Sequence, residues 1–183
     1  GSAPFFNEVE AIRRISIHIR HNYPDLKIMY KPHPARQHYL DNDRANLELL
    51  DNVLLYKQKT SDFGVSKPTS DSIDQFPPLS GYRDLLRKAR AIISGPTTML
   101  LEASLCRKKV LLLGYDDNNL TSPGRMLTQY LHFENIERLS NVTICWEIET
   151  LGNHLNKLLA SGSFEEKIPD SLDYFVHTDS SPW

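Results

Sequence analysis

Apolar residues recur at two different spacings along the chain, and each spacing predicts one kind of secondary structure. The first stripe has a residue every three or four positions, as on one face of a helix: Phe5, Val9, Ile12, Ile15 and Ile19. Pro24 ends this predicted helix, because a proline restricts the residue before it to extended conformations. Further stripes predict helices at residues 82–89, 97–106, 122–131 and 148–159.

Short apolar runs lie between these stripes and predict strands. They occupy residues 26–30, 52–56, 91–94, 110–113 and 142–146. Residues 110–113 are apolar throughout, as expected for a strand of a parallel sheet that helices cover on both faces. Residues 57–79 show neither spacing and predict a long loop. Strands that alternate with helices predict an α/β fold with a mostly parallel sheet.

Composition narrows the class of protein. The chain has 183 residues, of which 40% are apolar and 24% charged, as in an ordinary soluble globular domain. A formal net charge of −2 disfavours nucleic acid as a partner, because binding it requires many phosphate-neutralising cations. No apolar run approaches the roughly 20 residues of a membrane-spanning helix. Two cysteines, Cys106 and Cys145, cannot form a dense disulfide framework, so a reducing, cytoplasmic location is expected.

The pattern also predicts how the chain is organised. Residues 1–3 resemble a cloning scar, residues 4–160 form the predicted α/β domain, and residues 161–183 form a polar C-terminal tail. A chain that starts directly in a helix is expected to be a fragment of a longer protein.

Polar residues follow the predicted strand at 91–94, in the sequence SGPTTMLLEA from Ser94 onward. Gly95 permits a close approach to the backbone, and Pro96 suits the first position of a helix. The N–H groups of residues 97–99 would then point out of the helix start. Open donors at a helix start form an anion site, and a diphosphate is the natural guest.

Thr98 and Glu102 lie four residues apart and therefore share one face of the predicted helix. At that spacing the threonine end can hold phosphate while the carboxylate accepts hydrogen bonds from a ribose. The alternative is an ordinary amphipathic helix with a threonine cap and an exposed glutamate.

A second candidate element is the sequence YKPHPAR, which follows the first predicted strand. Pro34 forces His33 into an extended conformation, so an imidazole at the strand end can donate to a phosphate oxygen with little further ordering. Lys31 and Arg36 would add positive charge. The alternative is a histidine that caps a turn.

Other polar residues give weaker signals. Asp116 and Asp117 follow the predicted strand at 110–113, where they can bind a sugar hydroxyl, a metal or nothing, because turn chemistry alone accounts for them. His18 and His21 can pair on a metal, but a solvated helix face is the favoured explanation, and no metal site is expected. The chain lacks both the glycine-rich dinucleotide fingerprint and the phosphate-binding loop that ends in Gly-Lys-Ser/Thr, which disfavours Rossmann redox chemistry and ATP hydrolysis.

KPHP, GYRDLLRKAR and AIISGPTTMLLEASLCRKKVLLLGYDD together resemble the C-terminal half of GT-B glycosyltransferases over residues 25–160. The likeness is greatest to bacterial capsule polysaccharide transferases and to CDP-glycerol glycerophosphotransferases. It implies a Rossmann-like three-layer domain that binds a CMP-, CDP- or UDP-activated donor. An N-terminal domain of the same protein would then supply the general base that activates a hydroxyl of the acceptor, a glycan or a lipid-linked molecule. The resemblance also implies work at the inner face of the cytoplasmic membrane.

The resemblance also implies roles for residues. His33 would contact donor phosphate and act catalytically, Thr97 and Thr98 would cradle phosphate, and Glu102 would hold ribose. No cofactor is implied, because the activated donor is itself a substrate. The candidate nucleotide-binding set is Lys31, His33, Arg36, Ser94, Gly95, Pro96, Thr97, Thr98 and Glu102, with Asp116 and Asp117 as candidate sugar ligands.

Two other functions remain open at this point. The SGPTT region is also similar to the nucleotide-binding part of UDP-N-acetylglucosamine 2-epimerases, which implies an isomerase. The glycerophosphotransferases usually carry Asp-Tyr-Ser-Ser where this chain has residues 94–98, and this departure leaves a sugar nucleotide open as donor. A non-enzymatic α/β binding domain of response-regulator type is the third alternative, although its acidic phosphoacceptor pocket has no counterpart at these strand ends.

Overall fold

Strands in this protein pair only in parallel among the residues that the structure describes. The computed structural model describes residues 8–31, 46–47, 49–56, 79–117, 122–160, 172 and 174–175. Two compact units divide the chain, an N-terminal unit within residues 7–82 and a C-terminal unit within residues 83–183. The protein is an α/β protein, as predicted, and its described strands form two parallel sheets, β1-β2 and β3-β4-β5.

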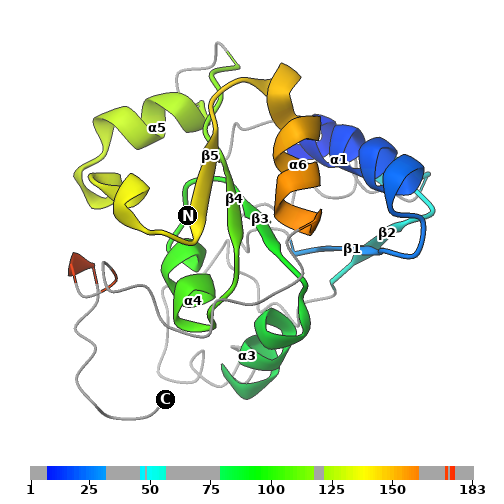
Figure 1. Ribbon diagram of the computed structural model, residues 1–183, viewed down its shortest axis with the longest axis horizontal. Helices are drawn as coiled ribbons and strands as arrows, with labels where there is room; N and C mark the ends of the chain where they lie inside the picture. Colours follow the sequence, from blue (N-terminus) through cyan, green and yellow to red (C-terminus); the bar gives the residue numbers. More distant parts are fainter. Residues whose placement is uncertain are drawn as a thin grey trace, which may run out of the picture. The chain divides into compact units, whose positions relative to one another are not determined.

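The N-terminal unit contains one long helix and two short strands, labelled in Figure 1. Helix α1 spans Glu8–Asn22, strand β1 spans Ile28–Tyr30 and strand β2 spans Val53–Leu55. The strands run in parallel with Ile28 opposite Val53. The predicted apolar stripe is the buried face of α1, where Ile12, Ile15 and Ile19 are at most 8% exposed.

One buried polar contact ties α1 to the segment before β2. Ser16 Oγ donates to Asn52 Oδ1 at 2.5 Å, and Asn52 Nδ2 donates to the Ser16 carbonyl oxygen at 3.0 Å. Ser16 is 2% exposed and Asn52 3% exposed. The Ser16 hydroxyl and the Asn52 side-chain amide are therefore both hydrogen-bonded although both side chains are buried.

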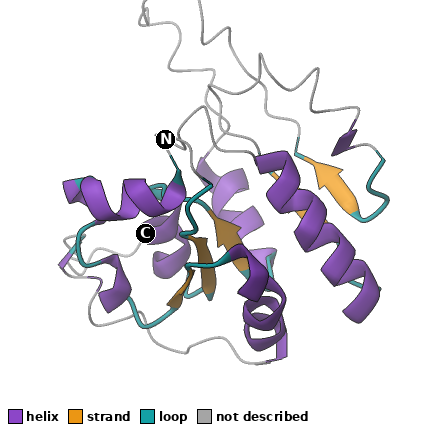
Figure 2. Ribbon diagram, turned by 90° about the horizontal axis from the view of Figure 1, so that it is seen from above, coloured by secondary structure: helices purple, strands orange, loops and turns teal. Residues whose placement is uncertain are grey.

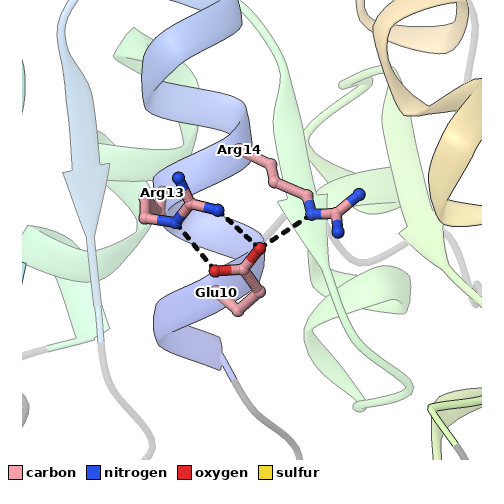
Figure 3. A network of polar contacts seen from close by, with 3 residues as sticks. All are labelled: Glu10, Arg13 and Arg14. Atoms are coloured by element: carbon pink, nitrogen blue, oxygen red, sulfur yellow. Dashed lines mark hydrogen bonds and ion pairs between the residues drawn. The ribbon is translucent and has the colours of Figure 1, made fainter.

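The solvent side of α1 carries a small charge network (Figure 3). Glu10 lies one turn before two arginines, and its carboxylate accepts hydrogen bonds from Arg13 Nε at 2.8 Å and from Arg14 Nε at 2.9 Å. The two guanidinium groups stabilise the ionised carboxylate and lower the pKa of Glu10 from 4.5 to about 2. Two acidic residues in the first turn also suit the positive end of the helix dipole.

The C-terminal unit alternates strands with helices. Helix α3 (Leu79–Lys88), which belongs to this unit from Arg83 onward, leads into β3 (Ile92–Ser94). Helix α4 (Met99–Leu105) and strand β4 (Val110–Leu113) follow. Next come α5 (Pro123–Gln129), β5 (Val142–Cys145) and α6 (Leu151–Ala160). Three short 3₁₀ turns complete the described elements: η3 (Leu131–Phe133), η4 (Ile136–Arg138) and η5 (Ile148–Thr150).

Strand β4 lies in the middle of a three-stranded sheet. Ile92 pairs with Val110, and Val110 pairs with Val142, so the three strands start level with one another. Figure 1 shows α5 to the left of the three strands and α6 to their right, and both α4 and α6 contact β4. Figure 2 shows the same unit from above, with helices around its strands. All four residues of β4 are at most 4% exposed, which confirms the prediction of a strand covered on both faces.

The predicted helix at residues 122–131 begins as expected but ends early. Ser122 is the N-cap, with its hydroxyl accepting from Arg125 N at 3.4 Å, and Pro123 occupies the first turn. Tyr130 then adopts an extended backbone, with φ −100° and ψ 120°. The helical stripe therefore stops, and Tyr130 and Leu131, the last two residues of the predicted helix, are 47% and 85% exposed.

The predicted tail contributes to the fold through the part of it that the structure describes. Leu172 is completely buried. Tyr174 is exposed, but its hydroxyl accepts a hydrogen bond from Asn135 Nδ2 at 3.1 Å, and the Arg138 guanidinium lies 5.3 Å from its ring centre. These two contacts attach Tyr174 to the η4 region of the C-terminal unit.

Candidate functional site

The carboxyl ends of β3, β4 and β5 meet at one edge of the C-terminal sheet. Ser94 ends β3, Gly114 follows β4, and Trp146 follows β5. The Gly114 N–H donates to the Cys145 carbonyl oxygen at 2.9 Å, which continues the ladder one residue past β4. Because parallel strands lie about 4.8 Å apart, the loops after β3 and β4 are neighbours. This is the edge at which open α/β sheets bind ligands.

The turn after β3 is organised by hydroxyl groups. Ser94, which is 6% exposed, donates from Oγ to the Gly95 carbonyl oxygen at 2.8 Å, and its Oγ lies 3.3 Å from Thr97 Oγ1. Thr97 Oγ1 also accepts from the Met99 N–H at 3.3 Å. One of the three amides predicted to be open is therefore satisfied within the turn, because the Thr97 side chain reaches it.

The two remaining amides keep their capacity for a ligand. The N–H groups of Thr97 and Thr98 donate to no acceptor among the residues that the structure describes. Helix α4 begins at Met99 rather than Thr97 and has seven residues. Such a short helix has a small dipole. The attraction of this turn for an anion would therefore come from its own N–H groups rather than from the helix.

Gly95 leaves an open space beside the backbone of this turn. A Cβ built on Gly95 would meet no heavy atom within 4 Å, and the backbone of Gly95 does not have a positive φ. The turn itself therefore does not require glycine, and the missing side chain leaves room for another molecule to approach. The close approach of a ligand to this backbone stays a prediction.

Thr98 and Glu102 lie where the sequence spacing placed them. Thr98 is the N-cap residue of α4, and its side chain makes no capping hydrogen bond. The Glu102 N–H lies 3.4 Å from the Thr98 carbonyl oxygen, so the two residues are one helical turn apart. Both are exposed, which leaves the hydroxyl and the carboxylate available to a ligand on one side of the helix start.

The loop after β4 is packed against the start of α5. A Cβ on Gly124 would lie 2.7 Å from the Gly114 carbonyl oxygen, and a Cβ on Gly114 would lie 2.6 Å from Ile144 Cγ2. Both glycines therefore permit a contact that a side chain would prevent. The backbone nitrogen of Asp116 lies 3.4 Å from the position that a Cβ on Gly124 would take. The close packing therefore fixes the position of Asp116.

Asp116 forms an ion pair that the sequence analysis did not include. Arg125, in the first turn of α5, donates from Nε to Asp116 Oδ2 at 3.2 Å. The sequence did contain a signal for this residue, because the helix start at Ser122-Pro123 places Arg125 in the first turn of the helix. Asp117 is half-buried, and its Oδ2 atom is shielded from solvent. Trp146, 52% exposed at the same edge, was also missed.

The second predicted element is described only at its beginning. Lys31 directly follows β1 and is half-buried in the N-terminal unit. His33 and Arg36 lie outside the described residues. Their predicted contribution to a phosphate site therefore stays a prediction.

The cysteines do not have the properties of nucleophiles. Cys145 is buried, and its Sγ donates to the Glu147 carbonyl oxygen at 3.1 Å. Burial raises the pKa of both the Cys145 and the Cys106 thiols, which disfavours the reactive thiolate.

Within the described ranges, no group of three or more His, Cys, Asp or Glu side chains is arranged to hold a metal ion. His18 and His21 lie on α1, where His21 is exposed. Among the same residues, no helix combines the length and the apolar character that crossing a membrane requires.

Comparisons with known proteins identify no relative. No protein-family model, no curated protein and no solved structure matches this chain.

Proposed function

We propose that the C-terminal unit binds the nucleoside diphosphate of an activated donor, for transfer of a sugar or polyol phosphate to an acceptor hydroxyl. The observation that carries this proposal is the open face of Gly95 at the carboxyl end of β3. Beside it lie two N–H groups, of Thr97 and Thr98, that donate to no described acceptor. An anion at this position would receive both amides without displacing any of the protein groups that the structure describes.

Each residue of the turn would contact a different part of the ligand. The amides and the Thr98 hydroxyl would hold phosphate oxygens, while Ser94 keeps Thr97 in place through the 3.3 Å contact of their hydroxyl oxygens. Glu102, one turn further along α4, would accept hydrogen bonds from ribose hydroxyls. The GT-B resemblance assigns a further phosphate contact to His33, which lies outside the described residues, and that role stays a prediction.

The chemistry proposed for this site is electrostatic. In sugar transfer the bond between the sugar and the diphosphate breaks and a nucleoside diphosphate leaves, whereas in polyol phosphate transfer a P–O bond within the diphosphate breaks and a nucleoside monophosphate leaves. In both cases negative charge grows on the oxygen of the leaving phosphate. Hydrogen-bond donors that are already in position stabilise the more negative transition state more than they stabilise the bound donor. This difference lowers the barrier to transfer. Removing one such donor typically slows a reaction by about 10²–10³-fold. The base that activates the acceptor would belong to another domain.

Titration with a panel of nucleotides tests the proposal. We expect CDP or UDP to bind the 183-residue chain in calorimetry and to raise its melting temperature, because a ligand at a hundredfold excess over its Kd stabilises the folded state by about 2.7 kcal/mol. Absence of binding by CMP, CDP, UMP and UDP at millimolar concentration would refute it. Conversion of UDP-N-acetylglucosamine to its 2-epimer by the full protein without an acceptor would instead support the isomerase alternative.

A further inference from the structure

Arg125 is a cation at the edge of the sheet where the proposed nucleotide site lies. It belongs to the first turn of α5, whose start packs on the loop after β4 through the close approach of Gly124 to the Gly114 carbonyl oxygen. Its backbone N–H is held by the Ser122 cap at 3.4 Å. The Cα of Arg125 is thus fixed by the same packing that fixes the loop after β4.

The side chain of Arg125 is held through one nitrogen only. Nε donates to Asp116 Oδ2 at 3.2 Å, and within the part of the chain that the structure describes Nη1 and Nη2 make no hydrogen bond. The side chain is 37% exposed. A guanidinium anchored at Nε presents its two terminal nitrogens as a planar fork, the geometry that matches two oxygens of one phosphate.

We infer that Arg125 binds a second anionic group of the ligand, the terminal phosphate of a nucleoside diphosphate, with Asp116 as the residue that positions it. This inference rests on the proposed function, because it places the first phosphate at the amides beside Gly95. Loops after adjacent parallel strands begin about 4.8 Å apart, and two phosphates of a diphosphate can span neighbouring loops at that separation. The site therefore favours diphosphates over monophosphates, and Asp116 acts through Arg125 rather than on a sugar.

Comparison of matched nucleotides tests this preference directly. Calorimetry of the 183-residue chain with CMP against CDP, and with UMP against UDP, gives the ratio of the two affinities. We expect the diphosphate to bind wild type about 10–100-fold more tightly, the range for a charged hydrogen-bonded contact, and Arg125→Gln to remove most of that advantage while monophosphate affinity changes little. Arg125→Lys should retain part of it, because an ammonium supplies charge without the planar fork.

Two further variants separate direct binding from a general effect of charge. Arg107→Gln removes an equal charge at the opposite, amino edge of β4 and should leave the ratio unchanged. If Arg125 merely neutralised Asp116, the double variant Asp116→Asn with Arg125→Gln would recover wild-type affinity for diphosphate. We expect it to remain weak, and recovery would overturn the inference.

Fluorescence provides an independent readout at this edge. Trp146 lies against Gly114, and its Cε3 atom is 3.3 Å from the position that a Cβ on Gly114 would take. Gly114 is two residues before Asp116. In a Trp183→Phe background Trp146 is the only tryptophan, since the chain has two. We expect CDP or UDP to change its emission and Arg125→Gln to weaken that response in parallel with the calorimetric affinity.

The possible failures are distinguishable. A diphosphate-to-monophosphate ratio that stays the same in Arg125→Gln would overturn the role of Arg125 and leave the proposed function intact. Failure of every nucleotide to bind wild type would overturn the proposed function and this inference together. Because the Arg125 backbone N–H bond to Ser122 does not depend on its side chain, the melting temperature of Arg125→Gln should remain close to that of wild type.

Discussion

Asn141 donates from Nδ2 to Ser104 Oγ at 2.9 Å and to the Lys108 carbonyl oxygen at 2.7 Å. The bond between Asn141 and Ser104 links the residue before β5 to the end of α4. Ser104 is 0% exposed and Asn141 is 5% exposed. Lys108 itself is buried, donates from Nζ to the Arg87 carbonyl oxygen, and has its pKa lowered by that burial. A buried polar cluster thus closes the amino edge of the sheet, opposite the candidate site.

Loss of the Asn141 side chain should destabilise the C-terminal unit. In Asn141→Ala the Lys108 carbonyl and the Ser104 hydroxyl lose their donor while they remain buried, which costs about 1–3 kcal/mol. A lower midpoint in urea unfolding would show this. Asn153→Ala, on the exposed side of α6, is the matched control and should change stability by less than about 0.5 kcal/mol. Equal effects of the two substitutions would contradict the role given to the buried cluster.

Gly95→Ala should separate folding from binding. The added methyl group meets no protein atom within 4 Å, and the φ of Gly95 is not positive, so the melting temperature should stay near that of wild type. The same methyl group would occupy the space into which the proposed phosphate must fit, and nucleotide affinity should fall by at least about tenfold. Calorimetry and thermal unfolding on the same sample measure both effects. Wild-type affinity in this variant would remove the turn after β3 from the site.

Gly124→Ala should have the opposite outcome. Its Cβ would lie 2.7 Å from the Gly114 carbonyl oxygen, a backbone atom that cannot rotate away. Helix α5 must then shift from the loop after β4, at a cost of about 1–3 kcal/mol, typical of overpacking. Thermal unfolding measures the loss, and Gly95→Ala is the control with the same chemical change. Unaltered stability would mean that α5 does not need this close approach.

Leu172→Ala should show that the C-terminal segment is part of the folded unit. The side chain is completely buried, and its truncation leaves a cavity, which typically costs about 2–5 kcal/mol. Leu131→Ala is the comparison, because Leu131 is 85% exposed and should cost little. Denaturant unfolding in the Trp183→Phe background, followed by the fluorescence of Trp146, measures both. A negligible effect of Leu172→Ala would place the segment outside the cooperative unit.

Acid should remove the contribution of the Glu10 network. The folded-state pKa of Glu10 is lowered from 4.5 to about 2 by Arg13 and Arg14, so the stabilisation is complete above pH 4.5 and disappears as the pH falls towards 2. Because the groups are exposed, the effect should remain below about 1 kcal/mol and shrink in 1 M salt. Glu10→Gln should therefore be less stable than wild type at pH 7 and equal to it near pH 2. Glu134→Gln, at an exposed position, is the control.

The sequence predicted most of the elements because each depends on local spacing. The stripe that ends before Pro24, the apolar run at residues 110–113 and the Ser122-Pro123 helix start all correspond to elements of the structure. Local spacing failed where a tertiary or backbone constraint took over. Tyr130 leaves the helix and turns Leu131 outward, and Thr97 uses its hydroxyl to satisfy an amide that the pattern left open.

The sequence by itself determined the alternation of strands and helices and the small polar residues after each strand, since both follow from neighbours along the chain. Only the tertiary structure decided that Arg125 reaches Asp116, that Gly95 faces open space while Gly114 and Gly124 do not, and that Leu172 is buried. Each of these depends on which segments distant in sequence pack together. Spacing along one segment carries no information about the atoms that another segment brings against it.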